Sequence, residues 1–367
     1  MKNLETIIKT ETGIIDTNIE CYEILPSPNK ILSEIPSSEK ARLTVMNGRK
    51  DIKHILDYND SRKVIIVGPC SIHDLPAAKS YGEKLARLAK EVKEQLVIVM
   101  RIYLEKPRSK IGWKGIIDDP DLDNSNNVEK GIKISRQLLL DINELGLPCA
   151  DEFLRQDIPQ YISDLISWGA IGARTVESQT HRELASGLSM PIGFKNNTGG
   201  DISVAVDAAV TARSMNTFLG ITPDGRICSV RTRGNLYSHI VLRGGNGQPN
   251  YHPEKIRETS ELMEQAKINA GIIVDCSHAN SNKQYEEQEK VAYEVLDQIA
   301  HGTKKIVGIM IESNLYEGKQ DFPKTKQARE KLKYGVSITD SCIGWETTER
   351  NIKKYAEVQK KLRQDSE

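Results

Sequence analysis

The sequence predicts an α/β fold, a (β/α)8 barrel (TIM barrel) with an N-terminal extension and an inserted β-hairpin. Short apolar runs rich in β-branched residues alternate with amphipathic stretches, a pattern typical of parallel strands buried on both faces and of their covering helices. Polar or charged residues follow nearly every run, as they do where the strand ends of a barrel form a catalytic face. A doubly wound open sheet is the alternative fold.

The N-terminal part differs from the rest of the chain. Residues 1–45 are polar and several prolines interrupt them, so we expect a regulatory or oligomerisation arm before a catalytic domain over 46–367. The stretch 37–59 predicts a helix that leads into the barrel, because Ser38 can cap it and apolar residues recur within it at helical spacing.

The apolar runs predict the barrel strands in order. They are 64–68, 96–103, 147–153, 170–175, 191–196, 239–243, 271–277 and 305–312. Amphipathic stretches such as 77–95 and 130–146 predict the intervening helices. The hairpin is predicted at about 215–235, between the fifth and sixth strands, because a Pro-Asp-Gly turn at 223–225 separates two short β-branched runs.

Composition excludes several classes of function. The 51 basic residues equal the 51 acidic residues in number, so no overall basic field would attract nucleic acid or acidic membranes. The sequence has no long apolar run and no apolar signal-peptide core at its start, and its six cysteines form no C-x-x-C pair. Neither a P-loop nor a dinucleotide-binding glycine motif is present. We expect a cytoplasmic protein with no membrane or nucleic-acid partner.

Cations gather at the predicted strand ends. They are Arg101, Lys106, Arg108, Arg174, Lys195 and Arg243. Any one of them could form an ordinary surface salt bridge. Together at one barrel mouth they would repel one another unless anions lay between them, and guanidinium groups match phosphate and carboxylate oxygens. The sequence therefore predicts strongly anionic substrates, with more than one phosphate.

A second set of side chains could hold a metal ion. Cys70, His278, Glu312 and Asp340 also follow predicted strands or lie near the end of the barrel. This mixture of thiolate, imidazole and carboxylate suits a divalent Mn, Fe, Co or Zn ion better than Ca or Mg. No spacing motif supports the set. The alternative is that Cys70 is simply a small buried residue and His278 is an ordinary loop residue.

Ordered motifs cover almost the whole chain from residue 40 to residue 350. They include GPCSIHD (68–74), MRIYLEKPRS (100–109), ADEFL (150–154), SWGAIGART (167–175), DCSHANS (275–281), GIMIESNLYEG (308–318) and SITDSCIGWE (337–346). On these motifs the sequence resembles the feedback-regulated type I synthases of 3-deoxy-D-arabino-heptulosonate 7-phosphate (DAHP) of microbes and fungi.

The resemblance implies a reaction. Members of this family condense phosphoenolpyruvate with D-erythrose 4-phosphate and water to give DAHP and phosphate. This is the first step of the shikimate pathway of aromatic amino-acid biosynthesis. The resemblance also implies a required divalent metal ion, an aromatic amino-acid effector, and a homodimer or homotetramer.

The resemblance also assigns roles to residues at matching motif positions. It implies Cys70, His278, Glu312 and Asp340 as metal ligands. It implies Arg101, Lys106, Arg174, Lys195 and Arg243 as the cradle for phosphoenolpyruvate, with Glu152 retained beside it. Arg108 and Ser109 would hold the aldose phosphate, and Lys106 or His278 would handle protons.

Several positions bear on regulation or depart from the family pattern. Leu188, Ser189, Phe218 and Gly220 correspond to the effector site, and Gly220 favours tyrosine over phenylalanine because it leaves room for the phenol. Ser109 stands where many relatives have threonine. Asp151 precedes Glu152 where Gly-Glu often precedes the phenylalanine.

Three other functions remain as alternatives. A 3-deoxy-octulosonate 8-phosphate synthase would use the same chemistry on a five-carbon aldose phosphate. A Schiff-base aldolase would use Lys195 as its nucleophile. A phosphosugar-sensing barrel would bind without turnover.

Overall fold

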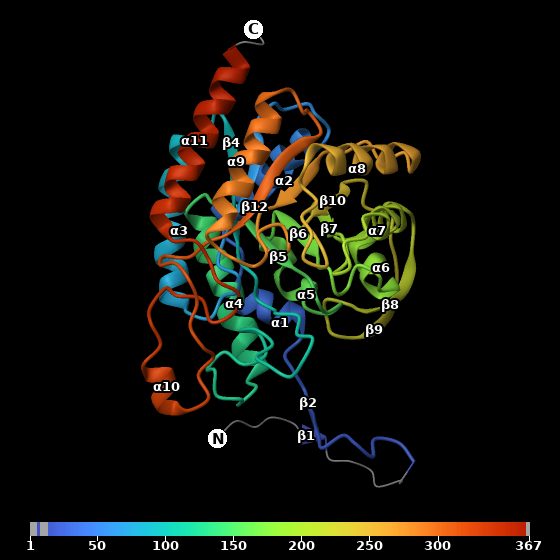
Figure 1. The fold of residues 1–367 in the computed structure, drawn as a ribbon. Coiled ribbons are helices and arrows are strands. Elements are labelled where there is room, and N and C mark those ends of the chain that lie inside the picture. Colours follow the sequence, from blue (N-terminus) through green and yellow to red (C-terminus); the bar gives the residue numbers. More distant parts are fainter. Residues whose placement is uncertain (1–5, 8–13, 365–367) are drawn as a thin grey trace.

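A closed barrel of eight parallel strands organises the computed structural model, which describes residues 6–7 and 14–364 (Figure 1). The strands are β3 (Lys63–Gly68), β4 (Leu96–Arg101), β5 (Cys149–Glu152), β6 (Trp168–Ile171), β7 (Ile192–Lys195), β10 (Ser238–Leu242), β11 (Ile272–Asp275) and β12 (Ile306–Glu312). The last strand pairs with the first in parallel, from Gly308 with Val64 to Glu312 with Gly68. The barrel prediction is confirmed, and the open-sheet alternative is wrong because this pairing closes the sheet.

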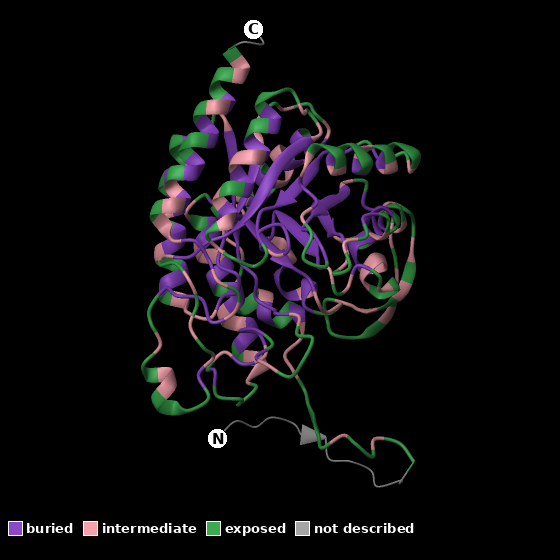
Figure 2. Cartoon of the chain, in the orientation of Figure 1, coloured by how far each residue is buried: buried purple, intermediate pink, exposed green. Residues whose placement is uncertain are grey.

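Helices surround the barrel on its outside (Figure 1). They are α3 (Leu75–Glu91), α4 (Val128–Glu144), α5 (Pro159–Ile162) with a 3-10 turn (Ser163–Leu165), α6 (Gln179–Gly187), α7 (Ser203–Arg213), α8 (Pro253–Gln265), α9 (Glu287–Ala300) and α11 (Trp345–Gln364). A short helix, α10 (Lys326–Glu330), lies in the long excursion between β12 and α11. Figure 2 shows buried strands inside and helices whose exposed faces point outward.

Alternation along the strands creates two apolar cores. In β3, Val64 and Ile66 pack inside the barrel, whereas Ile65 and Val67 pack in the layer that includes helix residues. Burial of apolar surface stabilises each layer by about 25 cal/mol per Å2 removed from water. Because both faces are apolar, a charged side chain on a strand finds polar surroundings only near the strand ends.

Helix α2 (Glu39–Leu56) closes one end of the barrel. Its residues Ile52, Ile55 and Leu56 join the interior cluster. The predicted cap is confirmed, because Ser38 Oγ accepts a hydrogen bond from Ala41 N at 3.1 Å. The opposite end of the barrel is therefore the end that can hold an active site.

The predicted N-terminal arm is described in two sections. Residues 1–5 and 8–13, which the prediction also includes, lie outside the described residues. Helix α1 (Pro28–Glu34) packs on the barrel, where Tyr161 Oη donates to Pro26 O at 2.9 Å. Before it, β1 (Thr6–Ile7) pairs with β2 (Tyr22–Glu23) and projects away from the barrel (Figure 1).

The inserted hairpin is confirmed. Strands β8 (Thr217–Ile221) and β9 (Ile227–Arg231) pair antiparallel between β7 and β10. The turn uses Gly225 at φ +79°, a conformation that favours glycine. The N-terminal segment contacts this turn, since Asn29 N donates to Pro223 O at 2.8 Å and Asn29 Nδ2 donates to Asp224 Oδ1 at 2.6 Å.

No helix among residues 14–364 combines the length and the apolar character that crossing a lipid bilayer requires.

Candidate active site

A cavity of about 280 Å3 opens at the carboxyl ends of the strands. The sequence-predicted residues that line it are Arg101, Lys106, Glu152, Arg174, Lys195, Arg243, His278 and Asp340. Two further predicted residues, Cys70 and Glu312, lie behind this lining and are buried. Arg108 and Ser109 are exposed on the loop that follows β4 and do not line the cavity itself.

The pair of Arg101 and Glu312 lies deepest in the site. Arg101 Nη2 donates to Glu312 Oε1 at 2.8 Å, and the two side chains are only 1% and 2% exposed. Arg101 also donates to Pro69 O at 3.1 Å, and its guanidinium lies 3.6 Å from the centre of the Tyr103 ring. Burial lowers the Arg101 pKa, but Tyr103 and Glu312 outweigh it and raise that pKa above its ordinary value. Arg101 therefore stays charged and holds Glu312 in place.

Lys195 is held between two carboxylates. Its Nζ lies 3.0 Å from Asp275 Oδ2 and 3.9 Å from Glu152 Oε2. Gly172 leaves the space that Glu152 occupies, since a Cβ on that glycine would lie 2.1 Å from Glu152 Oε1. Burial raises the Asp275 pKa, but His278, Lys195 and Arg101 outweigh burial and hold the pKa well below its usual range. The carboxylates thus orient a charged lysine toward the cavity.

Two arginines complete the cationic lining. Arg243 follows β10, and its backbone N donates to Asn196 Oδ1 at 2.9 Å. Burial lowers its pKa, and the nearby charge of Arg174 adds to that shift while Asp275 opposes it. Arg174 is exposed on the turn after β6, and its Nε donates to Ser109 Oγ at 3.0 Å. Two like charges near one another indicate a place for an anion.

A group of potential metal ligands adjoins the cationic lining. Donor atoms of Cys70, Glu312 and Asp340 all lie within 4.8 Å of one another. His278 Nε2 is 3.9 Å from Glu312 Oε1 but does not fall within this tight group. Its Nδ1 lies 2.9 Å from Asp275 Oδ2, which leaves Nε2 on the side of Glu312. The structure therefore brings three of the four predicted ligands together and places the fourth beside them.

The charges around Cys70 suit a divalent cation. Burial raises the pKa of its thiol to about 11, and Glu312 and Asp340 add to this shift while Lys106 opposes it. Lys106 Nζ lies 2.7 Å from Cys70 Sγ and 3.4 Å from Asp340 Oδ2. A divalent cation among these donors would favour the thiolate, and a mixed thiolate and carboxylate set fits a transition metal or zinc.

Sequence reasoning missed several residues that line the cavity. Tyr103, Thr198, Asn246 and Lys283 are among them. Lys283 follows the DCSHANS motif by two positions, and it adopts φ +60°, which is uncommon for a residue other than glycine. No spacing in the sequence marks these residues, because only the loop conformations bring them to the cavity.

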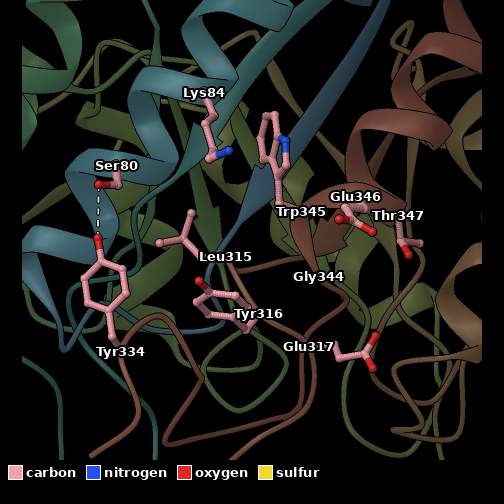
Figure 3. Close-up of a pocket in the computed structure, with 10 residues that line it drawn as sticks. All are labelled: Ser80, Lys84, Leu315, Tyr316, Glu317, Tyr334, Gly344, Trp345, Glu346 and Thr347. Carbon is pink, nitrogen blue, oxygen red and sulfur yellow. Dashed lines mark hydrogen bonds between the residues drawn. The ribbon is translucent and has the colours of Figure 1, made fainter.

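A larger hollow of about 610 Å3 lies elsewhere, between α3 and the start of α11 (Figure 3). Lys84 Nζ lies 5.5 Å from the centre of the Trp345 ring in this hollow, and Tyr334 Oη donates to Ser80 Oγ at 3.0 Å. Lys84 is the cation in its lining, and Glu317 and Glu346 accompany it. This hollow thus lacks the cluster of cations that an anionic substrate needs.

Comparisons with known proteins agree with the geometry. The model of the DAHP synthetase I family matches residues 35–353. The chain is 50% identical to the Phe-sensitive phospho-2-dehydro-3-deoxyheptonate aldolase of Escherichia coli K12, over 94% of this chain and 97% of that protein. It is 48% identical to the tyrosine-inhibited enzyme of Candida albicans, over 94% and 93%. The solved phospho-2-dehydro-3-deoxyheptonate aldolase of Francisella tularensis superimposes with a TM-score of 0.89 at 46% identity, over 92% and 98%.

The matches run through the barrel strands and the loops that form the cavity. The chain therefore belongs to the DAHP synthetase I family.

Proposed function

We propose that this chain condenses phosphoenolpyruvate with D-erythrose 4-phosphate and water, giving DAHP and inorganic phosphate. The observation that carries the proposal is a single cavity in which several cations adjoin a Cys, Glu and Asp donor group. Both substrates are anions with a phosphate, and one of them has a carbonyl group that needs polarisation. The names of the relatives, phospho-2-dehydro-3-deoxyheptonate aldolases, describe the same product.

The cations would bind the donor substrate. Arg174, Lys195 and Arg243 surround the open part of the cavity and would neutralise the phosphate and carboxylate of phosphoenolpyruvate. Arg101 is already paired with Glu312, so its main contribution is to fix that carboxylate and the cavity wall. Glu152 balances Lys195 and keeps it oriented. Binding here would hold C3 of the donor toward the acceptor aldehyde.

The acceptor would lie nearer the loop that follows β4. Arg108 and Ser109 are exposed on this loop and would hold the aldose phosphate, with Ser109 already linked to Arg174. Cys70, His278, Glu312 and Asp340 would hold a divalent Mn, Fe, Co or Zn ion beside it. When bound, such an ion supplies polarisation of the acceptor carbonyl.

The residues of the chain can then support the bond changes. C3 of phosphoenolpyruvate forms a bond to the aldehyde carbon, and water adds to C2 and loses one proton. The resulting tetrahedral centre loses its hydroxyl proton as the C–O bond to phosphate breaks, so that the former aldehyde oxygen and the departing phosphate each gain one proton. Lys106 Nζ, which lies 2.7 Å from Cys70 Sγ, is the candidate to supply the proton of the former aldehyde oxygen, because His278 Nε2 would be occupied by the metal ion.

The alternatives fit the site less well. A Schiff-base lysine needs a free amine that can reach the substrate carbonyl, whereas Lys195 Nζ is paired with Asp275 Oδ2 at 3.0 Å and lies 3.9 Å from Glu152 Oε2. The five-carbon acceptor of a 3-deoxy-octulosonate 8-phosphate synthase would have to share the same loop, and the KPRS motif resembles that of enzymes with a four-carbon acceptor.

The proposal predicts aldose-dependent release of phosphate from phosphoenolpyruvate. Release should require D-erythrose 4-phosphate, fall by at least about tenfold with D-arabinose 5-phosphate, and persist after borohydride treatment with substrates present. A colorimetric phosphate assay measures all three conditions. Faster turnover of the five-carbon aldose, or inactivation by borohydride trapping at Lys195, would contradict the proposal.

An aromatic amino-acid effector would bind beside the inserted hairpin. Leu188 ends the α6 turn next to the hairpin, and Phe218 and Gly220 share one face of β8. A Cβ at Gly220 would lie 2.8 Å from Val230 Cγ2 and 3.7 Å from the Phe218 ring. A side chain at position 220 would therefore crowd Val230, and the glycine keeps this part of the hairpin free of a side chain. The choice of tyrosine over phenylalanine rests on the family resemblance at this position.

Substitution of Gly220→Ser should weaken inhibition by tyrosine by about tenfold and improve inhibition by phenylalanine. The serine side chain takes the space of the tyrosine phenol and forces Val230 to shift. Inhibition constants for both amino acids, measured on the wild type and the variant, test this. Ser229→Ala, an exposed change on β9 opposite Leu219, is the control and should leave both inhibition constants unchanged. Stronger inhibition of the wild type by phenylalanine than by tyrosine would contradict the choice of effector.

A second copy of this chain would cover the projecting N-terminal segment. Ile14 and Ile15 are 87% and 61% exposed, and on the hairpin Leu219 and Ile227 are 73% and 83% exposed. Exposed apolar groups on extended segments are typical of subunit contacts. We expect a dimer or tetramer by light scattering, and removal of residues 1–24 should lower the mass toward that of one chain. A wild-type mass of one chain at micromolar concentration would contradict this.

A further inference from the structure

Two buried carboxyl groups lie directly behind the wall of the cavity. Asp151 in β5 is 0% exposed, and Glu105, which precedes Lys106, is 1% exposed. Asp151 shares the outward face of its strand with Cys149, whereas its neighbour Glu152 lines the cavity. Neither Asp151 nor Glu105 lines the cavity, so any effect on substrates must act through other residues.

These carboxyl groups connect the two backbone segments that carry cavity residues. Asp151 Oδ1 accepts hydrogen bonds from Leu104 N at 3.2 Å and from Glu152 N at 2.8 Å. Glu105 Oε2 accepts a bond from Leu154 N at 3.4 Å. The segment before Lys106 is thereby tied to the end of β5. Displacing either carboxyl group would let Lys106 and Glu152 move relative to each other.

The cations near the pair do not balance its charge. Arg155 Nε lies 3.3 Å from Glu105 Oε1, but Arg155 also pairs with Asp118. Asp118 and Asp157 add negative charge on the Glu105 side, and Glu152, Tyr103 and Cys149 are the titratable groups that interact with Asp151 from its own and the neighbouring strand. Within residues 14–364, Asp151 Oδ2 and Glu105 Oε1 are buried acceptors with no hydrogen-bond donor.

A proton bound by the Asp151–Glu105 pair would reduce the number of buried acceptors and remove one negative charge. Burial raises the pKa of Asp151 well above its usual range, and the adjacent Glu105 adds to the shift. Burial also raises the pKa of Glu105, to about 7, against the opposing charge of Arg155. Two neighbouring buried carboxylates cannot both ionise without strong repulsion, so the first proton to leave comes from the pair and not from one residue alone.

We propose that Asp151 is a positioning residue whose buried carboxyl group holds the Leu104–Lys106 segment against Glu152, so that Lys106 and Glu152 keep their relative positions on the two sides of the substrate cavity. Its catalytic consequence rests on the proposed function.

The sign of the pH effect follows from the direction of the shift. A carboxyl group whose pKa is higher in the folded than in the unfolded chain binds its proton more tightly when folded. Its contribution to stability is complete at low pH and is lost as pH rises through the folded pKa. Asp151→Asn keeps the acceptor for Leu104 N and Glu152 N but cannot ionise. The Tm of this variant relative to the wild type should therefore rise as the pH increases above about 4, the ordinary pKa of an aspartic acid.

Steady-state kinetics separate positioning from packing. Asp151→Asn should keep the KM for phosphoenolpyruvate within about twofold of the wild type at about pH 6.5, and it should flatten the rise of KM toward alkaline pH. Asp151→Leu removes both hydrogen bonds and adds volume at this buried position, so its KM should rise about tenfold, with a smaller change in kcat.

The proposal is overturned if the Tm difference between Asp151→Asn and the wild type does not change with pH, or if the Asn and Leu variants have the same KM. The Tm comparison needs no substrate and remains decisive even if Asp151→Leu does not fold. A wild type that releases no phosphate would instead sink the proposed function while leaving the protonation of Asp151 open to the Tm test.

Discussion

The structure depends on one electrostatic constraint: cations that would bind anionic substrates must be held at buried strand ends before those substrates arrive. Three of the buried cations each have an anionic or polarisable partner. Arg101 pairs with Glu312, Lys195 with Asp275, and Lys106 lies against Cys70 and Asp340. Breaking one such pair would leave a buried charge uncompensated and would cost roughly 3–5 kcal/mol of unfolding free energy. The side chains that balance these cations thus include Cys70, Glu312 and Asp340, the donor group that would bind a metal ion.

The barrel supplies the positions for this charge arrangement. Parallel pairing all the way around brings the ends of β3, β4, β7, β10, β11 and β12 to one face, while α2 fills the other face with Ile52, Ile55 and Leu56. Charged groups that lie far apart in the sequence can therefore meet at one site, as Arg101 and Glu312 do across 211 residues. The long segment between β12 and α11 brings Asp340 back to the end of β3, where Cys70 follows the strand.

Much of this arrangement was predictable from the sequence. Continuous β-branched runs predicted the strands, and the Pro-Asp-Gly turn predicted the hairpin, because these signals are local. The strand-end cations predicted an anion site for the same reason. The motif resemblance joined the distant ligands Cys70, Glu312 and Asp340 into one group, which spacing alone could not do.

Other features depend on three-dimensional packing. Asp151 and Glu152 are adjacent in β5, and adjacent strand residues point to opposite faces, so only Glu152 lines the cavity. Strand β6 ends at Ile171, so Arg174 reaches the cavity from a turn whose conformation no periodicity specifies. Leu43 and Met46 have helical spacing in α2 yet are 50% and 65% exposed, because the buried stripe of that helix runs through Val45 and Ile52 instead.

The most direct test of the account is Mn²⁺ binding followed by electron paramagnetic resonance, because the account makes the donor group and the cationic cradle parts of one site. Wild-type protein should bind one Mn²⁺ per chain, and phosphoenolpyruvate should change the spectrum of the bound ion. Cys70→Ala should weaken Mn²⁺ binding by at least about tenfold, whereas Cys276→Ala, which removes another buried thiol, should not. Unaltered Mn²⁺ affinity in Cys70→Ala, or a spectrum that phosphoenolpyruvate leaves unchanged, would contradict a shared site.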